Sequence, residues 1–252
     1  MRAGGVFFDL YGTLVTLDDV SAAWADWLTA LHAALLEFGL QMNRDEFALC
    51  CDGFFGRPEP AAGDEGYTAY ERRMRVHTAE LGLVLDRKSL KRVCSAALDA
   101  WHAHVRIDPE ARQVLAELKP HTTLALISNF DQAPHVHAFL SEEGLAGFFD
   151  AVLVSDEVGL KKPDPRIFQL ALERTGLTPE RVLHVGDMRD DVVGARAAGI
   201  TPVLIRREWA EPIIPDFLIR SNPSDYFSNE APSDEVRVIG ALSALIDLVQ
   251  AG

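Results

Sequence analysis

The sequence predicts an α/β fold: a Rossmann-like, doubly wound parallel sheet with a helical domain inserted after its first strand. From about residue 106 onward, short apolar runs alternate with helical segments, which is typical of a parallel sheet covered by helices on both faces. From about Ser21 to Val105 the pattern is helical throughout. We therefore expect residues 1–15 and 106–252 to form an α/β core domain and residues 16–105 a separate helical domain.

The strands of the core are predicted from short apolar runs. The first is expected at residues 6–10, where Val6-Phe7-Phe8 leads into a turn at Gly12. After Asp108-Pro109, which indicates a helix start, later strands are expected at Leu124–Ile127, Ala151–Val154, Val182–Val185, Val203–Ile205 and Val236–Ile239.

The helical domain is predicted from three stripes of side chains at helical spacing. Gly39 is expected to end the first helix. Residues 210–233, rich in Pro, Ser, Asn and Asp, predict a long surface excursion. The stripes are Trp24, Trp27, Leu28, Leu31, Leu35 and Phe38; Tyr67, Tyr70, Met74, His77 and Leu81; and Leu90, Val93, Ala97, Leu98, Trp101 and Val105.

The composition narrows the functional class. A net charge of −14 argues against a nucleic-acid partner, because phosphate backbones require clustered Lys and Arg. No apolar run approaches the length of a membrane span, and the N-terminus lacks the pattern of a secretory signal. The 3 cysteines fit neither a disulfide framework nor a zinc site, so we expect a cytoplasmic protein. We expect it to be a monomer or a homodimer.

Polar residues follow four of the expected elements of the core. Asp9 follows the first strand, and Ser128-Asn129 follows the run that ends at Ile127. Lys161-Lys162 comes after the third run, and a segment that contains Asp187 and Asp191 follows the fourth. Ligands of open parallel sheets collect at the carboxyl ends of the strands, so we expect these groups to converge.

Four segments in this order resemble the motifs of the haloacid dehalogenase (HAD) superfamily. They are Phe8-Asp9-Leu10-Tyr11-Gly12-Thr13-Leu14-Val15, Ile127-Ser128-Asn129, Lys162-Pro163-Asp164-Pro165, and Val185-Gly186-Asp187 through Asp191 to Gly199. The resemblance runs from residue 6 to about residue 206. It implies that the helical domain at residues 16–105 is a C1-type cap over an HAD core.

The resemblance also implies a set of site residues. Asp9 is the expected nucleophile, which would form an aspartyl-phosphate. Mg²⁺ would bind to the carboxylates of Asp9 and Asp187 and to the backbone carbonyl of Tyr11. Asp191 would be a further ligand or would lie behind these ligands without binding the ion. Ser128 and the Asn129 backbone amide would bind the phosphoryl group, while Lys162 neutralises charge on the nucleophile and the phosphate.

One position departs from the phosphatases of this superfamily, which usually carry a second Asp two residues after the nucleophile. Here that residue is Tyr11. The missing Asp would protonate the leaving group, whereas a phenol with a pKa of about 10 is a poor general base near neutral pH. Tyrosine at this place resembles the L-2-haloacid dehalogenases, whose halide leaving group requires no proton.

The fourth motif favours the opposite interpretation, because the dehalogenases use no Mg²⁺ and replace the first acid, which this chain keeps as Asp187. We therefore predict a Mg²⁺-dependent phosphatase acting on a small phosphorylated substrate. Two alternatives stay open: a metal-free dehalogenase of 2-haloacids with Asp9 as nucleophile, and a vestigial binding protein. If phosphatase activity is present, aryl or acyl phosphates should react best.

Other polar residues receive structural interpretations. His184 lies in an apolar strand and is expected to be a satisfied core residue. Asp131 is expected to cap a helix, and Asp190 to face solvent or cap the next helix. Arg72, Arg73 and Arg75 are interpreted as a solvated face, with an anionic substrate as the alternative.

Overall fold

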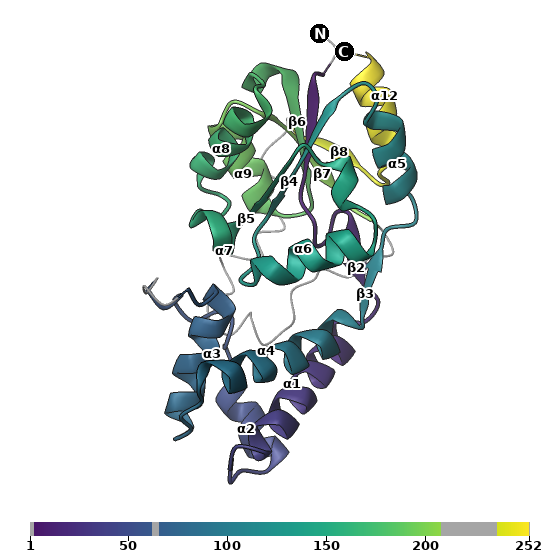
Figure 1. Cartoon of the computed structure of the whole chain (residues 1–252). Helices are drawn as coiled ribbons and strands as arrows, with labels where there is room; N and C mark the ends of the chain where they lie inside the picture. Colours follow the sequence, from purple (N-terminus) through teal and green to yellow (C-terminus); the bar gives the residue numbers. More distant parts are fainter. Residues whose placement is uncertain (1–2, 62–65, 208–235, 252) are drawn as a thin grey trace. The chain divides into compact units, whose positions relative to one another are not determined.

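The computed structural model of the chain describes residues 3–61, 66–207 and 236–251 (Figure 1). Two compact units make up this part of the chain, which passes from the first unit to the second after Thr16 and returns after Val105. The predicted surface excursion at residues 210–233 lies outside the described residues.

A six-stranded parallel sheet forms the centre of the first unit, in the order β5-β4-β1-β6-β7-β8. The chain starts at β1 in the middle, adds β4 and β5 on one side, and then adds β6, β7 and β8 on the other. This order confirms the predicted doubly wound fold and places β1 at the point where the winding reverses. The strands are β1 Gly5–Phe8, β4 Thr123–Ser128, β5 Ala151–Val154, β6 Val182–Gly186, β7 Thr201–Ile205 and β8 Arg237–Ile239.

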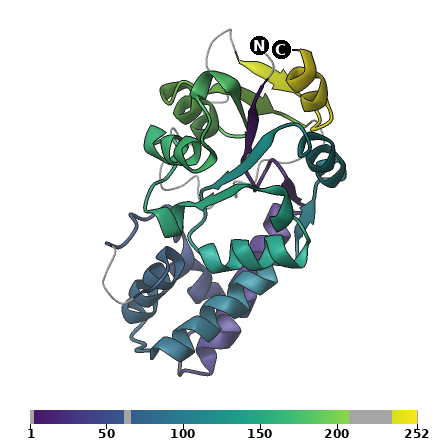
Figure 2. The ribbon, with the colours of Figure 1, turned by 45° about the horizontal axis from the view of Figure 1, so that its top comes forward.

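Helices cover both faces of this sheet. Figures 1 and 2 show α8 and α9 on one face, and α5 with α12 on the other. The short strands β2 Val15–Leu17 and β3 Val105–Ile107 form a separate two-stranded sheet. The helices are α5 Ala111–Leu118, α6 Ala133–Glu142, α7 Ser155–Val158, α8 Pro165–Thr175, α9 Arg189–Ala197 and α12 Ala244–Ala251, with 3₁₀ turns η1 Ala146–Phe148 and η2 Pro179–Arg181.

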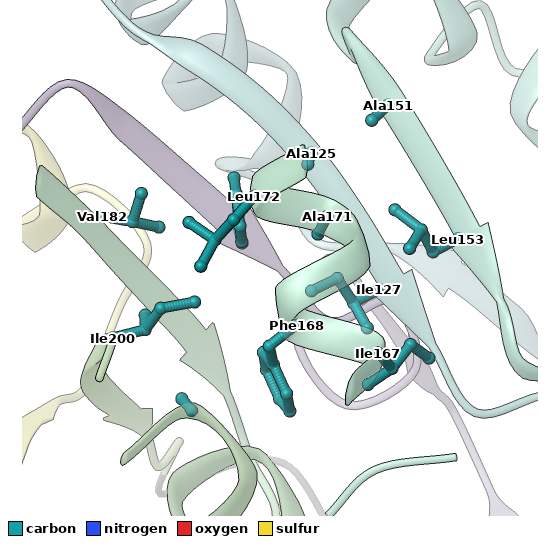
Figure 3. Close-up of a cluster of buried hydrophobic side chains, with 12 residues drawn as sticks. Ala125, Ile127, Ala151, Leu153, Ile167, Phe168, Ala171, Leu172, Val182 and Ile200 are labelled. Carbon is teal, nitrogen blue, oxygen red and sulfur yellow. The ribbon is translucent and has the colours of Figure 1, made fainter. Parts of the chain in front are cut away.

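Burial of α8 against the sheet produces a hydrophobic cluster in the first unit (Figure 3). Pro165 begins this helix, the Asp164 side chain accepts a hydrogen bond from the Arg166 amide, and Gly176 ends it. Strands β1 and β4 are apolar on both faces, as expected for a sheet between two helical layers. The cluster consists of Phe7, Ala125, Ile127, Ala151, Leu153, Ile167, Phe168, Ala171, Leu172, Val182, Ala195 and Ile200.

The second unit is helical, with α1 and α4 side by side (Figure 2). Its helices are α1 Val20–Leu36, α2 Arg44–Cys51, α3 Ala69–Glu80 and α4 Arg87–His102. Trp27 is buried and donates a hydrogen bond to the Tyr70 hydroxyl at 2.8 Å, which joins α1 to α3.

The predicted stripes run beyond these helices at their ends. Phe38 lies after the end of α1, Tyr67 lies before α3, and Leu81 follows the last residue of α3. Val105 was expected in the third helix, but it begins β3. Apolar spacing alone therefore extended each helix by one or a few residues.

No helix in the described part of the chain combines the length and the apolar character that a membrane crossing requires. The three cysteines are free thiols, and Cys51 and Cys94 are buried within the second unit.

Candidate active site

The carboxyl ends of three adjacent strands bring the candidate residues together. Asp9 directly follows β1, and Ser128 is the last residue of β4. Asp187 directly follows β6, and Asp191 lies in the first turn of α9. Lys162 arrives from the segment between α7 and α8. All five belong to the first unit.

Lys162 is the electrostatic centre of this group. Its Nζ donates to Asp9 Oδ1 at 2.5 Å and to Asp191 Oδ1 at 2.7 Å, and all three side chains are buried. A buried ammonium group is tolerated only where carboxylates compensate the lost hydration, and here two of them do so. Lys162 thereby fixes the Asp9 carboxylate through one oxygen and leaves the other available.

His184 is a member of the cluster that sequence reasoning missed. It lies in β6, is buried, and its Nε2 lies 2.8 Å from Asp191 Oδ1. The interpretation as an ordinary core residue is therefore incomplete, because one ring nitrogen contacts a site carboxylate. The signal available in the sequence was a titratable residue inside a strand that is otherwise buried and apolar.

The Asn129 side chain clamps the backbone of Lys162. Its Nδ2 donates to the Lys162 carbonyl, and its Oδ1 accepts from the Lys162 amide, both at 2.9 Å. This pair of hydrogen bonds ties the end of β4 to the segment that delivers the lysine. The side chain of Asn129 thus positions Lys162, a role beyond the one expected for its backbone amide.

Two glycines allow the close approach of backbone and carboxylates. Gly12 has φ of +94°, and a Cβ built there would lie 2.1 Å from Asp187 Oδ2. A Cβ on Gly186 would lie 2.1 Å from the Asp191 carboxyl carbon. Either substitution would displace an acidic side chain, so both glycines are required for the observed geometry.

Three carboxylates in this site could hold a metal ion. Asp9, Asp187 and Asp191 each offer an oxygen, and these oxygens lie within 4.8 Å of one another. Asp9 Oδ2, Asp187 Oδ1 and Ser128 Oγ are buried and have no hydrogen-bond partner among the described residues. Buried oxygens without partners are costly, and hard oxygen donors are what Mg²⁺ prefers, so the residues present fit a divalent cation and an oxyanion.

The pKa values reflect burial and mutual repulsion in this cluster. Burial raises the pKa of Asp9 to about 6, with Lys162 opposing the shift and Asp191 adding to it. Burial, followed by repulsion from Asp9, raises the pKa of Asp187 well above its usual range. Burial also works against ionisation of Asp191, but Lys162 and the His184 contact outweigh it and lower the pKa to about 2. One ammonium thus faces three carboxylates, which favours a bound cation.

Tyr11 contributes an aromatic side chain that stays neutral. Its ring stacks on Phe130, with centroids 4.7 Å apart and planes inclined by 22°. Burial and the nearby Asp9 raise the pKa of its phenol above the ordinary value. The Tyr11 phenol is therefore still less able to act as a general base than a solvated tyrosine.

The prediction that Asp131 caps a helix is wrong for α6. Gln132 occupies the position before α6. The Asp131 Oδ1 instead accepts a hydrogen bond from Lys161 Nζ at 2.7 Å. At α9 the amide of Met188 donates to Asp191 Oδ2 at 3.2 Å, so Asp191 rather than Asp190 makes this capping contact.

The interpretation of the α3 arginines as a solvated face holds for Arg75, which is exposed, but is wrong for Arg72 and Arg73. Arg72 pairs with Glu59 at 2.7 Å and donates to the carbonyls of Pro60 and Tyr67. Arg73 is buried and donates to the Arg57 carbonyl at 2.5 Å. These contacts tie Arg57, Glu59, Pro60 and Tyr67 to α3.

Comparison with known proteins places this site in a family. A family model described as haloacid dehalogenase-like hydrolase matches residues 4–199. A phosphoglycolate phosphatase from Photorhabdus laumondii is 30% identical over 204 residues, which cover 77% of this chain and 76% of that protein. A glyceraldehyde 3-phosphate phosphatase from Methanothermobacter thermautotrophicus is 46% identical over 69 residues, so the alignment spans only 30% of that relative's length.

Solved structures named as a phosphatase and as a dehalogenase both share this fold. A structure named HAD phosphatase from Thermococcus onnurineus has a TM-score of 0.64 at 22% identity, covering 99% of this chain and 98% of the other. A 2-haloacid dehalogenase from Pseudomonas syringae has a TM-score of 0.64 at 23% identity, with the same coverage. At these identities the similarity establishes the fold and leaves the reaction to the site.

Proposed function

We propose, from the premise that this chain belongs to the haloacid dehalogenase-like hydrolase family, that it is a Mg²⁺-dependent phosphatase with Asp9 as nucleophile. The observation that carries this proposal is the group of three carboxylates around Lys162. Without a cation, an ionised Asp187 would repel an anionic substrate from Asp9. A reaction that needs no metal gains nothing from that carboxylate.

The reaction follows from the way Asp9 is held. Lys162 binds Asp9 Oδ1, while Oδ2 has no partner among the described residues and is available for attack. An Asp9 oxygen attacks the phosphorus of the substrate, the bond from phosphorus to the leaving oxygen breaks, and an aspartyl-phosphate forms. Water then attacks the same phosphorus, the bond to Asp9 breaks, and phosphate departs with both protons of that water. The positive charge of Lys162 stabilises the negative charge that accumulates in both steps.

The residues proposed to hold Mg²⁺ are Asp9, the Tyr11 carbonyl and Asp187, with Asp191 ligating or just behind them. Bound there, the ion would neutralise charge between the carboxylates and the phosphoryl group. Both oxygens of Asp191 already accept hydrogen bonds, from Lys162 and His184 on Oδ1 and from the Met188 amide on Oδ2. This favours a place for Asp191 behind the metal ligands, from which it orients Lys162. Ser128 Oγ, buried without a partner among the described residues, is proposed to donate to a phosphoryl oxygen.

The substrate class is proposed from the absence of a proton donor at residue 11. A neutral phenol of raised pKa is a weak acid and does not readily protonate a departing alkoxide. Phosphate monoesters with acidic leaving groups and acyl phosphates, whose leaving groups depart as stable anions, should therefore react best. The substrate is a small phosphorylated molecule of this kind.

The helical unit is proposed to serve as the cap that selects this substrate. The proposed cap domain consists of residues 16–105, and the proposed core domain consists of residues 1–15 and 106–252. The cap assignment rests on the family, in which a helical domain inserted after the first strand sets substrate choice. We also propose a cytoplasmic location, in keeping with three free thiols. A monomer or homodimer stays a prediction.

Hydrolysis of p-nitrophenyl phosphate and acetyl phosphate, with Mg²⁺ and with EDTA, tests this function. We expect turnover that requires Mg²⁺ and is lost in Asp9→Asn, because the amide is not a nucleophile. Asp164→Asn is the matched control, since this half-buried carboxylate caps α8 outside the cluster, Asn can also cap a helix, and turnover should stay intact. If the parent protein hydrolyses neither of the two substrates, the proposal is overturned.

Dehalogenation remains the second candidate because Tyr11 occupies the place of the phosphatase Asp and because solved dehalogenases share the fold. In that reaction Asp9 would displace halide from the carbon of a 2-haloacid, and water would hydrolyse the resulting ester. Halide release from 2-chloropropionate in the presence of EDTA, with no phosphatase activity, would establish it.

A further inference from the structure

Arg207 is a buried cation that the proposed reaction does not use. It lies two residues beyond the end of β7, and its side chain is 2% exposed. Burial of a guanidinium is costly unless its charge and donors are satisfied. Asp108, also buried, supplies the charge: its Oδ2 accepts from Arg207 Nε and from a terminal nitrogen of Arg207, both at 2.8 Å.

The remaining donors of Arg207 point at the turn that follows the nucleophile. They bind the Gly12 carbonyl at 2.7 Å and the Thr13 carbonyl at 2.5 Å. The hydrogen bonds made within this turn use the carbonyls of Leu10 and Val15. Arg207 thus satisfies two acceptors that the turn itself leaves unused.

This turn lies directly against the proposed metal ligands. Gly12 adopts φ of +94° and is packed so closely on Asp187 that even a methyl group there would overlap its carboxylate. The carbonyl of the preceding residue, Tyr11, is the proposed backbone ligand. A shift of the Gly12–Thr13 turn would therefore move that carbonyl and the support of the Asp187 carboxylate together.

We propose that Arg207 is a positioning residue for the cation site: it holds the Gly12–Thr13 turn so that the Tyr11 carbonyl and Asp187 stay in binding geometry. The inference rests on the proposed function, because it concerns the cation of that site. Asp108 acts as the partner that keeps the guanidinium in place, and it also accepts from the Glu110 amide at 2.8 Å. Arg207 acts through the backbone and touches no reacting atom.

Mg²⁺ binding measured by isothermal titration calorimetry tests this role without relying on turnover. Arg207→Ala should weaken Mg²⁺ binding by about 10- to 100-fold, the effect typical of losing a group that orients metal ligands. Arg207→Lys should fall between the parent and Arg207→Ala, because one ammonium cannot replace the fork that reaches Asp108 and both carbonyls. Arg206→Ala is the matched control, since the neighbouring Arg206 side chain is exposed, and its Mg²⁺ affinity should equal that of the parent.

Guanidinium ion at low millimolar concentration provides a second readout. It should restore Mg²⁺ affinity in Arg207→Ala by occupying the space of the lost side chain, and it should not restore Asp187→Asn. If Arg207→Ala fails to fold, the titration of Arg207→Lys decides the question.

Two outcomes separate failure of this inference from failure of the proposed function. A parent protein that binds Mg²⁺, together with folded Arg207 variants that bind it within twofold of the parent, would overturn the role of Arg207 alone. A parent protein that binds no Mg²⁺ would overturn the metal site and the role of Arg207 with it.

Discussion

At the scale of single residues, the candidate site is organised by one lysine between two carboxylates. Lys162 fixes Asp9 and Asp191, and Asn129 fixes Lys162 through its backbone. The nucleophile is thus oriented before any substrate arrives, which is the arrangement that electrostatic catalysis requires. The residue two positions after the nucleophile is Tyr11, a weakly acidic phenol in place of a carboxylic acid.

Restoring that donor should change the leaving-group dependence. In Tyr11→Asp we expect kcat/KM for alkyl phosphates to rise by about 100-fold or more, the usual contribution of a positioned general acid. The rate for p-nitrophenyl phosphate should rise far less, because its leaving group departs without a proton. Steady-state assays on both substrates give the comparison. Tyr11→Asn is the control, and an equal gain in that variant would show that proton transfer is not the cause.

The raised pKa of Asp9 predicts how Mg²⁺ affinity depends on pH. With a pKa of about 6, the metal-free protein takes up a proton on Asp9 as the pH falls through that value. Binding of the cation must then displace the proton, so the affinity should decrease as the pH falls through 6, and the raised pKa of Asp187 acts in the same direction. Calorimetric titrations at pH 5, 6 and 7 measure this, and a constant affinity across the range would contradict the assignment of Asp9 as a ligand.

The residues that sequence reasoning found and missed differ in a physical way. Asp9, Ser128, Lys162 and Asp187 follow strands or lie in short motifs, so their convergence follows from the geometry of a parallel sheet. The contacts of Arg207 with Gly12 join residues 195 positions apart, and those of Asn129 with Lys162 join residues 33 apart. No local pattern encodes such pairings.

At the scale of elements, the strands of the sheet could be predicted because each is a short apolar run between turn-forming residues. The predicted ends of the helices in the second unit were less accurate, because apolar stripes continue past the residue at which each helix ends. A capping box at Thr68 and Glu71 marks the start of α3, and it is readable in the sequence. Val105 is β-branched and suits the strand that it begins.

The second unit should be sensitive to acid because of one histidine. Burial, with Arg57 adding to it, lowers the pKa of His77 in α3 to about 4 from an ordinary value of 6.5. Between these values the unfolded chain binds a proton that the folded chain excludes, so folding stability falls as the pH decreases from 6.5 to 4. The loss from this group is at most about 3 kcal/mol.

Urea unfolding at pH 7 and pH 4.5 checks this prediction. His77→Leu should show a smaller loss of stability between the two pH values than the parent protein. His121→Gln is the control, because this histidine is exposed and should leave the pH dependence unchanged. An identical loss in the parent and in His77→Leu would contradict the role given to His77.

At the scale of the whole molecule, a chain of net charge −14 concentrates three carboxylates in one buried site, at a cost in folding free energy. A cation that binds only the folded state offsets this cost. Mg²⁺ at 100 times its dissociation constant should stabilise the protein by about 2.7 kcal/mol and raise the unfolding temperature.

Thermal unfolding with Mg²⁺, compared with Na⁺ at equal ionic strength, checks this effect. Asp187→Asn should raise the unfolding temperature of the metal-free protein, since it removes a carboxyl group whose ionisation is opposed by burial and by repulsion from Asp9 and Asp191. The same variant should lose most of the response to Mg²⁺, whereas Asp190→Asn, with the same change of charge, should keep it. Equal Mg²⁺ responses in both variants would place the ion elsewhere.

The fate of oxygen during turnover in ¹⁸O-labelled water tests most directly whether this site hydrolyses a phosphate ester at phosphorus or an Asp9 ester at carbon. If Asp9 forms an aspartyl-phosphate, water attacks phosphorus, so we predict ¹⁸O in the released phosphate and none in the Asp9 carboxylate. Mass spectrometry of the phosphate and of the peptide that contains Asp9, after many turnovers of p-nitrophenyl phosphate with Mg²⁺, gives both values. A chain that incorporates ¹⁸O into Asp9 while it releases halide from 2-chloropropionate, and that leaves the phosphate ester intact, would contradict the phosphatase and establish an ester intermediate on carbon.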